Sequence, residues 1–252
     1  MPWAGQRRLA SDTGAEDTSR AEDGASEGKK GTKKEEREQP DERELLLEHA
    51  LKHAVEKGWS RDALRAAAKD LGLSPAIGGL LDRGDVELVE YFLDKCNGKL
   101  TEDLKSMEAQ LKEMRIRDKI RTAVKIRLEM VQPYINVWPQ ALAVLAQPQN
   151  APRAVSKLAK MVDDIWIAAG DTSEDYNWYT KRGLLAGLYS STELYMLTDT
   201  SPHYEDTWNF LDRRIEDIMV AGKATAQLGG FAKSLASDYD SMLQKIFTRK
   251  DS

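Results

Sequence analysis

Apolar residues recur at intervals of three and four through the middle of this chain, the spacing that places side chains on one face of a helix. One such stripe runs through Leu104, Met107, Leu111 and Met114. No segment alternates apolar and polar residues with the period of two that a half-buried strand requires. The pattern therefore predicts an all-α fold.

Glycines, prolines and N-cap residues divide these stripes into separate helices. With their capping and breaking residues included, helices are expected over 41–58, 60–72, 74–82, 85–100, 101–133, 134–147, 152–170, 172–196 and 201–219. A helix start is expected at Thr101, because threonine is a good N-cap residue.

The first four helices have a helix-turn-helix rhythm. The third would enter the major groove in a DNA-binding module, but it runs from Pro75 to Asp82 without an Arg, Lys, Asn or Gln that could reach a base edge. Between Glu42 and Leu100 eleven acids outnumber nine Lys and Arg residues, and the whole chain has a net charge of −5. We therefore expect residues 42–98 to form a helix-turn-helix-like bundle that does not bind nucleic acid.

A larger helical ligand domain is expected over residues 99–222. Its Leu, Met and Trp stripes can pack as an ordinary core. Alternatively, a domain so rich in Met and aromatic residues can leave a channel for an apolar ligand. Periodicity does not distinguish these two arrangements.

The N-terminal segment has the composition of a chain that does not fold by itself. Between Leu9 and Leu45 no large apolar residue occurs, so ordering this segment would bury too little surface to offset the entropy lost. Residues 1–41 are therefore expected to form a disordered leader. Arg7 and Arg8 faintly resemble the end of a targeting peptide, but acids begin at Asp12, so a targeting leader is not evident.

A linker at 223–229 and an amphipathic helix at 230–250 are expected to end the chain. The residues predicted to bind a membrane are Leu228, Phe231, Leu235, Tyr239, Met242 and Ile246. Such a helix docks on its own domain, on a partner or on a bilayer. Basic and acidic residues are nearly balanced from Phe231 onward, so membrane binding by this helix alone is expected to be weak and reversible.

The helix expected over 172–196 carries an aromatic pair among charges. At about 100° per residue, Trp178 and Tyr179 share a face with Asp175 and Arg182, and that face continues to Tyr189 and Glu193. The opposite face carries Leu184 and Leu188. If the leucines are buried, Trp178 and Tyr179 are held outward, among charges.

No catalytic constellation is found, and we assign no catalytic residue, metal ligand or cofactor. His49 and His53 are one helical turn apart, but no Glu follows His49 as in a zinc-protease motif, so a solvated pair is favoured. The single cysteine, Cys96, excludes an intrachain disulfide. No Glu-x-x-His pair occurs, which excludes the usual four-helix di-iron site.

Longer segments are specific enough to indicate a family. They read MVDDIW, GDTSEDYNWYTKR, LYSSTELYM, SPHYEDTWNFLDRRIED and IRLEMVQPYINVWPQAL. From about Leu45 to Met219 the chain resembles the mitochondrial ubiquinone (coenzyme Q) biosynthesis accessory lipid-binding proteins. The resemblance implies a TetR-regulator-like fold and a non-enzymatic protein that binds isoprenoid quinones and other lipids in a hydrophobic pocket. It also implies peripheral attachment to the matrix face of the mitochondrial inner membrane through the terminal helix.

The resemblance further implies docking onto the di-iron demethoxyubiquinone hydroxylase and contact with other ubiquinone-biosynthesis proteins. The family's docking patch carries over onto Asp175, Trp178 and Tyr179, and onto Ile165, where the family usually has a methionine. Arg182 joins this patch by its helical angle. Pocket residues are not assigned, because the family's pocket does not map onto a short motif.

Two other functions are consistent with an all-α chain. The first is a TetR-type transcription regulator with an apolar effector pocket, from which this chain differs in its third helix and its charge. The second is an autonomous redox enzyme, for which metal ligands are lacking. The native lipid and homodimerisation are left open.

Overall fold

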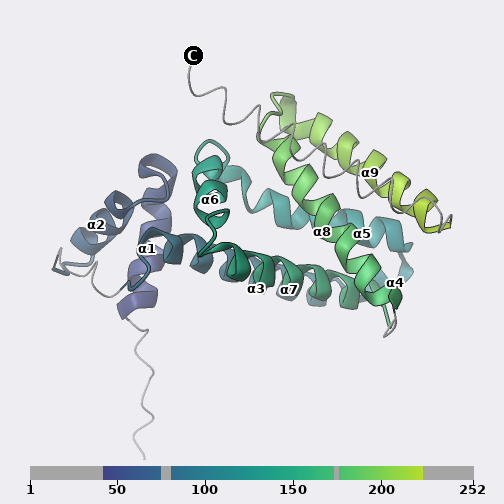
Figure 1. Cartoon of the computed structure of the whole chain (residues 1–252), viewed down its shortest axis with the longest axis horizontal. Coiled ribbons are helices and arrows are strands. Elements are labelled where there is room, and N and C mark those ends of the chain that lie inside the picture. The colour runs from purple at the N-terminus through teal and green to yellow at the C-terminus, as the bar shows by residue number, and fades with distance from the viewer. Residues whose placement is uncertain (1–41, 75–80, 173–175, 224–252) are drawn as a thin grey trace, which may run out of the picture. The chain divides into compact units, whose positions relative to one another are not determined.

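The computed structural model describes residues 42–74, 81–172 and 176–223, and every regular element within these ranges is helical (Figure 1). The predicted all-α class is thereby confirmed. The leader at 1–41, most of the helix expected at 74–82, and the linker and terminal helix from residue 224 onward lie outside the described residues. The six residues predicted to bind a membrane lie there too: Leu228, Phe231, Leu235, Tyr239, Met242 and Ile246.

Nine α-helices and two short 3-10 helices follow one another in the described part of the chain. They are α1 (Glu42–Lys57), α2 (Arg61–Asp70), α3 (Asp85–Ser106), α4 (Glu108–Glu113), α5 (Ile116–Glu129), η2 (Gln132–Tyr134), α6 (Trp138–Leu145), α7 (Ala151–Ala169), α8 (Tyr176–Met196), η3 (Pro202–Tyr204) and α9 (Glu205–Lys223). None of these helices is long and apolar enough to cross a bilayer.

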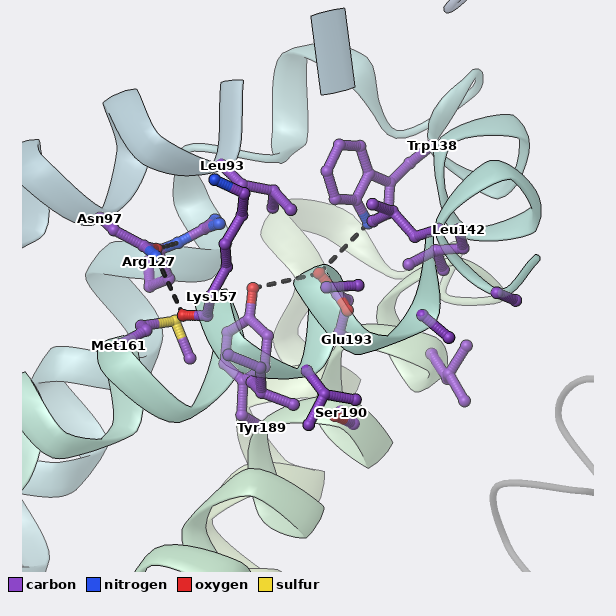
Figure 2. Close-up of a pocket in the computed structure, with 17 residues that line it drawn as sticks. Leu93, Asn97, Arg127, Trp138, Leu142, Lys157, Met161, Tyr189, Ser190 and Glu193 are labelled. Carbon is purple, nitrogen blue, oxygen red and sulfur yellow. Dashed lines mark hydrogen bonds between the residues drawn. The ribbon is translucent and has the colours of Figure 1, made fainter. Parts of the chain in front are cut away.

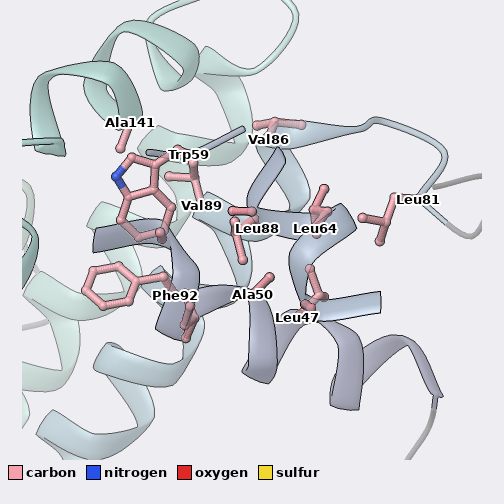
Figure 3. Close-up of a cluster of buried hydrophobic side chains, with 14 of the residues drawn as sticks. Leu47, Ala50, Trp59, Leu64, Leu81, Val86, Leu88, Val89, Phe92 and Ala141 are labelled. Carbon is pink, nitrogen blue, oxygen red and sulfur yellow. The ribbon is translucent and has the colours of Figure 1, made fainter. Parts of the chain in front are cut away.

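The first core lies between α1, α2, the first half of α3, and α6 (Figure 3). Ser60 begins α2 as predicted, because its hydroxyl accepts a hydrogen bond from the backbone N–H of Asp62 at 3.3 Å. The aromatic residue before this cap, Trp59, packs its ring 5.2 Å from Phe92 on α3 and 5.5 Å from Trp138 on α6. These aromatic contacts join three elements that are distant in sequence.

The predicted break at residues 100–101 is wrong, because α3 continues from Asp85 to Ser106. Thr101 does not cap a new helix; its hydroxyl donates to the carbonyl of Asn97 one turn earlier, at 3.0 Å. Leu100 and Leu104 on either side of it are both buried in the second core. Tertiary packing therefore carries the helix through a good capping residue.

The single helix predicted over 101–133 is also wrong, since the chain forms α4, α5 and η2 in this region. Met114 adopts an extended backbone with ψ 153° between α4 and α5. No glycine or proline marks this break in the sequence. The break redirects the chain so that α4 and α5 both pack against α7.

The second core is formed by the end of α3 together with α4, α5, α7, α8 and α9. Because α3 contributes to both cores, the domain boundary predicted at residues 98–99 falls within a continuous helix. The described helices α1 to α9 belong to one compact unit.

Candidate functional site: an apolar cavity and an aromatic corner

A cavity of about 310 Å³ lies among α3, α5, α6, α7 and α8 (Figure 2). Its walls are mainly apolar and include a small group of polar side chains. The lining residues are Leu93, Asn97, Arg127, Trp138, Leu142, Leu145, Ala146, Ala151, Ala154, Val155, Lys157, Leu158, Met161, Tyr189, Ser190, Glu193 and Leu194. A volume near 300 Å³ is at the lower end of the range of small-molecule sites, about 300–1,000 Å³.

Glu193 forms the first polar feature of the cavity wall. One of its carboxylate oxygens accepts hydrogen bonds from the Trp138 indole N–H at 3.2 Å and from the Tyr189 hydroxyl at 3.0 Å (Figure 2). Burial raises the pKa of Glu193, and the positive charge of Arg127 and these two hydrogen bonds oppose the rise. Burial also raises the pKa of Tyr189 well above its ordinary value, so its hydroxyl stays a donor at neutral pH.

Arg127 forms the second polar feature, and it is almost completely buried, with 1% exposed. Its Nε donates to the side-chain oxygen of Asn97 at 3.2 Å, and the Asn97 amide donates in turn to the Lys157 carbonyl at 3.2 Å. The guanidinium carbon lies 5.9 Å from the centre of the Tyr189 ring. Asn97 therefore has a fixed orientation, with its oxygen directed at Arg127.

The cavity wall reaches the surface at α7. Val155 lines the cavity and is also 63% exposed, an unusual fraction for a large apolar side chain. Ala154, next to Val155, and Ala151, one turn earlier on α7, are small and line the cavity as well. An apolar ligand longer than the cavity would therefore extend outward beside Val155.

The second candidate site is the corner where α7 leads into α8. Tyr179 is 72% exposed, and its ring packs edge-on against Trp178 with centroids 4.7 Å apart. The Arg182 guanidinium lies 4.2 Å from the centre of the Trp178 ring. Arg182 is itself held by Asp163 at 2.6 Å and by Asp171 at 3.0 Å. The aromatic pair is thus supported by a fixed cation.

The predicted patch residues are only partly brought together. Trp178, Tyr179 and Arg182 are adjacent at this corner, whereas Asp175 lies outside the described residues. Ile165 does not belong to the surface, because it is 1% exposed and packs in the second core. The methionine position of the family patch is therefore a core position in this chain.

The face that Trp178 and Tyr179 share with Tyr189 and Glu193 by helical angle is not equally exposed along α8. Tyr189 and Glu193 are buried and line the cavity. Helix α8 is exposed on that side near Tyr179, but α6 and α7 cover it further along. A helical wheel treats both halves alike and does not show this change.

Sequence reasoning missed the polar residues of the cavity, although a signal was present. Arg127 lies beside the apolar stripe of Ile120, Val124 and Leu128, and it is buried with them. A charge next to an apolar stripe on a core helix is the pattern that points to a polar group inside a domain. The partners, Asn97 and Glu193, could not be paired with it because they lie on other helices.

The cavity and the corner do not resemble a metal centre. No cluster of three or more His, Cys, Asp or Glu residues that could hold a metal ion occurs in the described ranges. Of the two histidines predicted to form a solvated pair, His53 has a side-chain partner. Its ring nitrogen lies 2.6 Å from a carboxylate oxygen of Asp70 on α2. His53 therefore joins α1 to α2.

Comparison of the fold places this chain near bacterial regulators. A TetR transcriptional regulator from Nitrosomonas europaea superposes with a TM-score of 0.56 and 20% identity, covering 69% of this chain and 96% of that one. The TetR-like fold predicted from the sequence is confirmed. At this identity the likeness shows the fold alone.

Comparison of the sequence gives a closer relationship. The COQ9 family matches residues 151–222. The mitochondrial ubiquinone biosynthesis protein COQ9-B of Xenopus laevis is 44% identical over 196 residues, which are 75% of this chain and 67% of that protein. The human COQ9 protein is 41% identical over 195 residues, 75% of this chain and 61% of its own length. The chain spans about two thirds of the length of such relatives. It belongs to the COQ9 family of mitochondrial ubiquinone biosynthesis proteins.

Proposed function

We propose that this protein is a non-enzymatic, lipid-binding accessory protein of ubiquinone biosynthesis. In this proposal the cavity holds an isoprenoid quinone intermediate, and the protein presents it to the di-iron demethoxyubiquinone hydroxylase at the matrix face of the inner membrane. The observation that carries the proposal is the apolar cavity, whose wall includes the exposed Val155. A cavity lined by Leu, Ala and Met with few polar groups suits a long apolar ligand.

The exposed corner supports docking to a protein partner. Trp, Tyr and Arg are the residues most enriched among interface hot spots, and Trp178, Tyr179 and Arg182 lie together here. Ion pairs to Asp163 and Asp171 hold the guanidinium in place, so little side-chain entropy is lost when a partner binds. The corner therefore has the composition and the rigidity of a docking anchor.

Lipid extraction tests the proposal directly. Organic extraction of the purified full chain should release an isoprenoid lipid detectable by mass spectrometry. The variant Ala154→Trp places an indole in the cavity wall and should lower the amount of lipid recovered several-fold. Arg153→Trp adds the same indole at a neighbouring exposed position of α7 and serves as the matched control. Equal recovery from both variants, or no lipid from the wild type, would contradict binding in this cavity.

Membrane attachment is proposed for the terminal segment on sequence grounds. Deleting residues 229–252 should reduce co-sedimentation with liposomes while leaving the lipid recovered by extraction unchanged. Undiminished co-sedimentation would place the membrane-binding surface elsewhere in the chain.

A further inference from the structure

The buried guanidinium of Arg127 has an incomplete set of partners. Its Nε donates to Asn97, but its Nη1 has no acceptor among the described residues. Glu193 lines the same cavity, yet its hydrogen bonds come from Trp138 and Tyr189. A buried cation without acceptors is costly, and buried N–H groups are nearly always paired in native proteins. The cavity wall thus holds a donor whose acceptor is missing.

The other cationic group of the cavity wall is already paired. The Lys157 ammonium lies 2.6 Å from a carboxylate oxygen of Asp94, at the outer end of its side chain. The Asn97 side chain is held in place, because it accepts from Arg127 and donates to the Lys157 carbonyl. Among the described residues that line this wall, Arg127 is the one with a buried side-chain N–H that has no acceptor.

We propose that Arg127 recognises an acceptor oxygen on the head of an amphiphilic ligand, whose apolar tail lies between α6 and α7 and leaves the cavity beside Val155. The proposal rests on the proposed function, because it assumes that the cavity holds a lipid. It adds the direction in which the lipid lies and the residue that selects its head. Leu142, Leu145 and Ala154 line the tail region, and a guanidinium fork suits carbonyl, phenol or phosphate oxygens.

Competition between three probes with the same tail separates the contribution of the head group to binding from that of the tail. The probes are a decyl-substituted benzoquinone, decyl methyl phosphate and decylbenzene, each offered to the delipidated full chain. Bound probe is measured by native mass spectrometry. The oxygen-bearing probe that binds better should outcompete decylbenzene by about tenfold or more, since hydrogen bonds to charged groups are worth at least that factor.

Two variants test whether Arg127 is responsible. Arg127→Met replaces a buried charge with an apolar side chain of similar length, and it also removes the positive charge near Glu193, so some loss of stability is expected. It should bring the preference down to about one while decylbenzene is still bound. Arg127→Lys keeps the charge and loses the fork, so the preference should fall several-fold without disappearing. If Arg127→Met does not fold, the head-group preference measured for Arg127→Lys decides whether Arg127 binds the head.

The outcomes distinguish the subsite from the lipid-binding function. A preference for the benzoquinone supports a neutral carbonyl head, and a preference for the phosphate supports an anionic head; both support the subsite. An undiminished preference in the Arg127 variants overturns the subsite, while retained decylbenzene leaves the proposed function standing. Failure of the wild type to retain any probe overturns the proposed function and the subsite with it.

Discussion

The carboxyl group of Glu193 combines two demands that oppose each other. It must stay an acceptor for the Trp138 indole and the Tyr189 hydroxyl, yet burial penalises its ionised form and raises its pKa. The unfolded chain ionises near the ordinary value of 4.5. Below that pH the acid is neutral in both states and its contribution to stability is fully present. This contribution is lost as the pH rises through the raised pKa of the folded state.

Substituting Glu193 tests this balance. Glu193→Gln keeps an acceptor oxygen and removes the ionisation, so the free energy of unfolding at neutral pH should equal or exceed that of the wild type. Its pH dependence above about 4.5 should also be flatter. Glu193→Leu leaves two buried donors without an acceptor and should cost about 1–3 kcal/mol for each. Urea unfolding over a pH series measures both effects. A Gln variant as unstable as the Leu variant would mean that the ionised carboxylate is needed beside Arg127.

The aromatic corner gives a second prediction for single residues. Tyr179 is 72% exposed, so Tyr179→Ala should change stability by no more than about 0.5 kcal/mol. Trp178→Ala also removes the stacking on Arg182, worth about 0.5–2 kcal/mol. The double variant should stay folded and lose capture of the demethoxyubiquinone hydroxylase in a pull-down.

Val55→Ala is the control for this experiment, because it truncates an exposed apolar side chain on α1. It should leave capture unchanged. A double variant that still captures the hydroxylase would move the docking surface away from the corner, and one that unfolds would show that the pair belongs to the core.

At the level of elements, two glycines test where α3 and α2 begin and end. Gly98 lies inside α3 with nothing near its missing Cβ, so Gly98→Ala should raise the free energy of unfolding by about 0.5–1 kcal/mol. Gly72 also has open space around it, but it lies just after the end of α2 and has a left-handed φ of +67°. Gly72→Ala should therefore lower stability by about 1–2 kcal/mol.

Both glycine variants are measured by urea unfolding, and each is the control for the other. The same atom is added in open space, so the opposite signs come from the backbone conformation alone. A destabilising Gly98→Ala would contradict a helical backbone at Gly98.

The helices could be predicted far better than their ends. Spacing of three and four gave the class and the order of most helices, because each core helix carries its own apolar stripe. The continuity at Thr101 and the break at Met114 could not be predicted, since packing of Leu100 and Leu104 and the approach to α7 decide them. The corner of Trp178 and Tyr179 was accessible because it lies within one helix. The cavity was not, because five helices supply its wall.

For the molecule as a whole, Trp138 is the side chain that links the two cores. Its ring packs against Trp59 and Phe92 in the first core, at 5.5 and 5.3 Å. Its indole N–H donates to Glu193 on α8, a helix that packs in the second core. Helix α3 provides a second link, because its first half packs in one core and its end in the other. Two independent connections favour cooperative unfolding of the described helices.

Cooperativity of this kind predicts that a ligand in the cavity protects α1, which contributes no residue to the cavity wall. In native-state hydrogen exchange, the slowest amides of α1 and α8 should open with the same free energy, equal to the global value from urea unfolding. A lipid at one hundred times its dissociation constant should raise both by about 2.7 kcal/mol. Trp138→Phe, which keeps an aromatic ring but loses the donor to Glu193, should reduce the protection transferred to α1. If α1 opens at a lower free energy that the lipid does not change, the first core unfolds on its own and the shared helix does not couple it to the cavity.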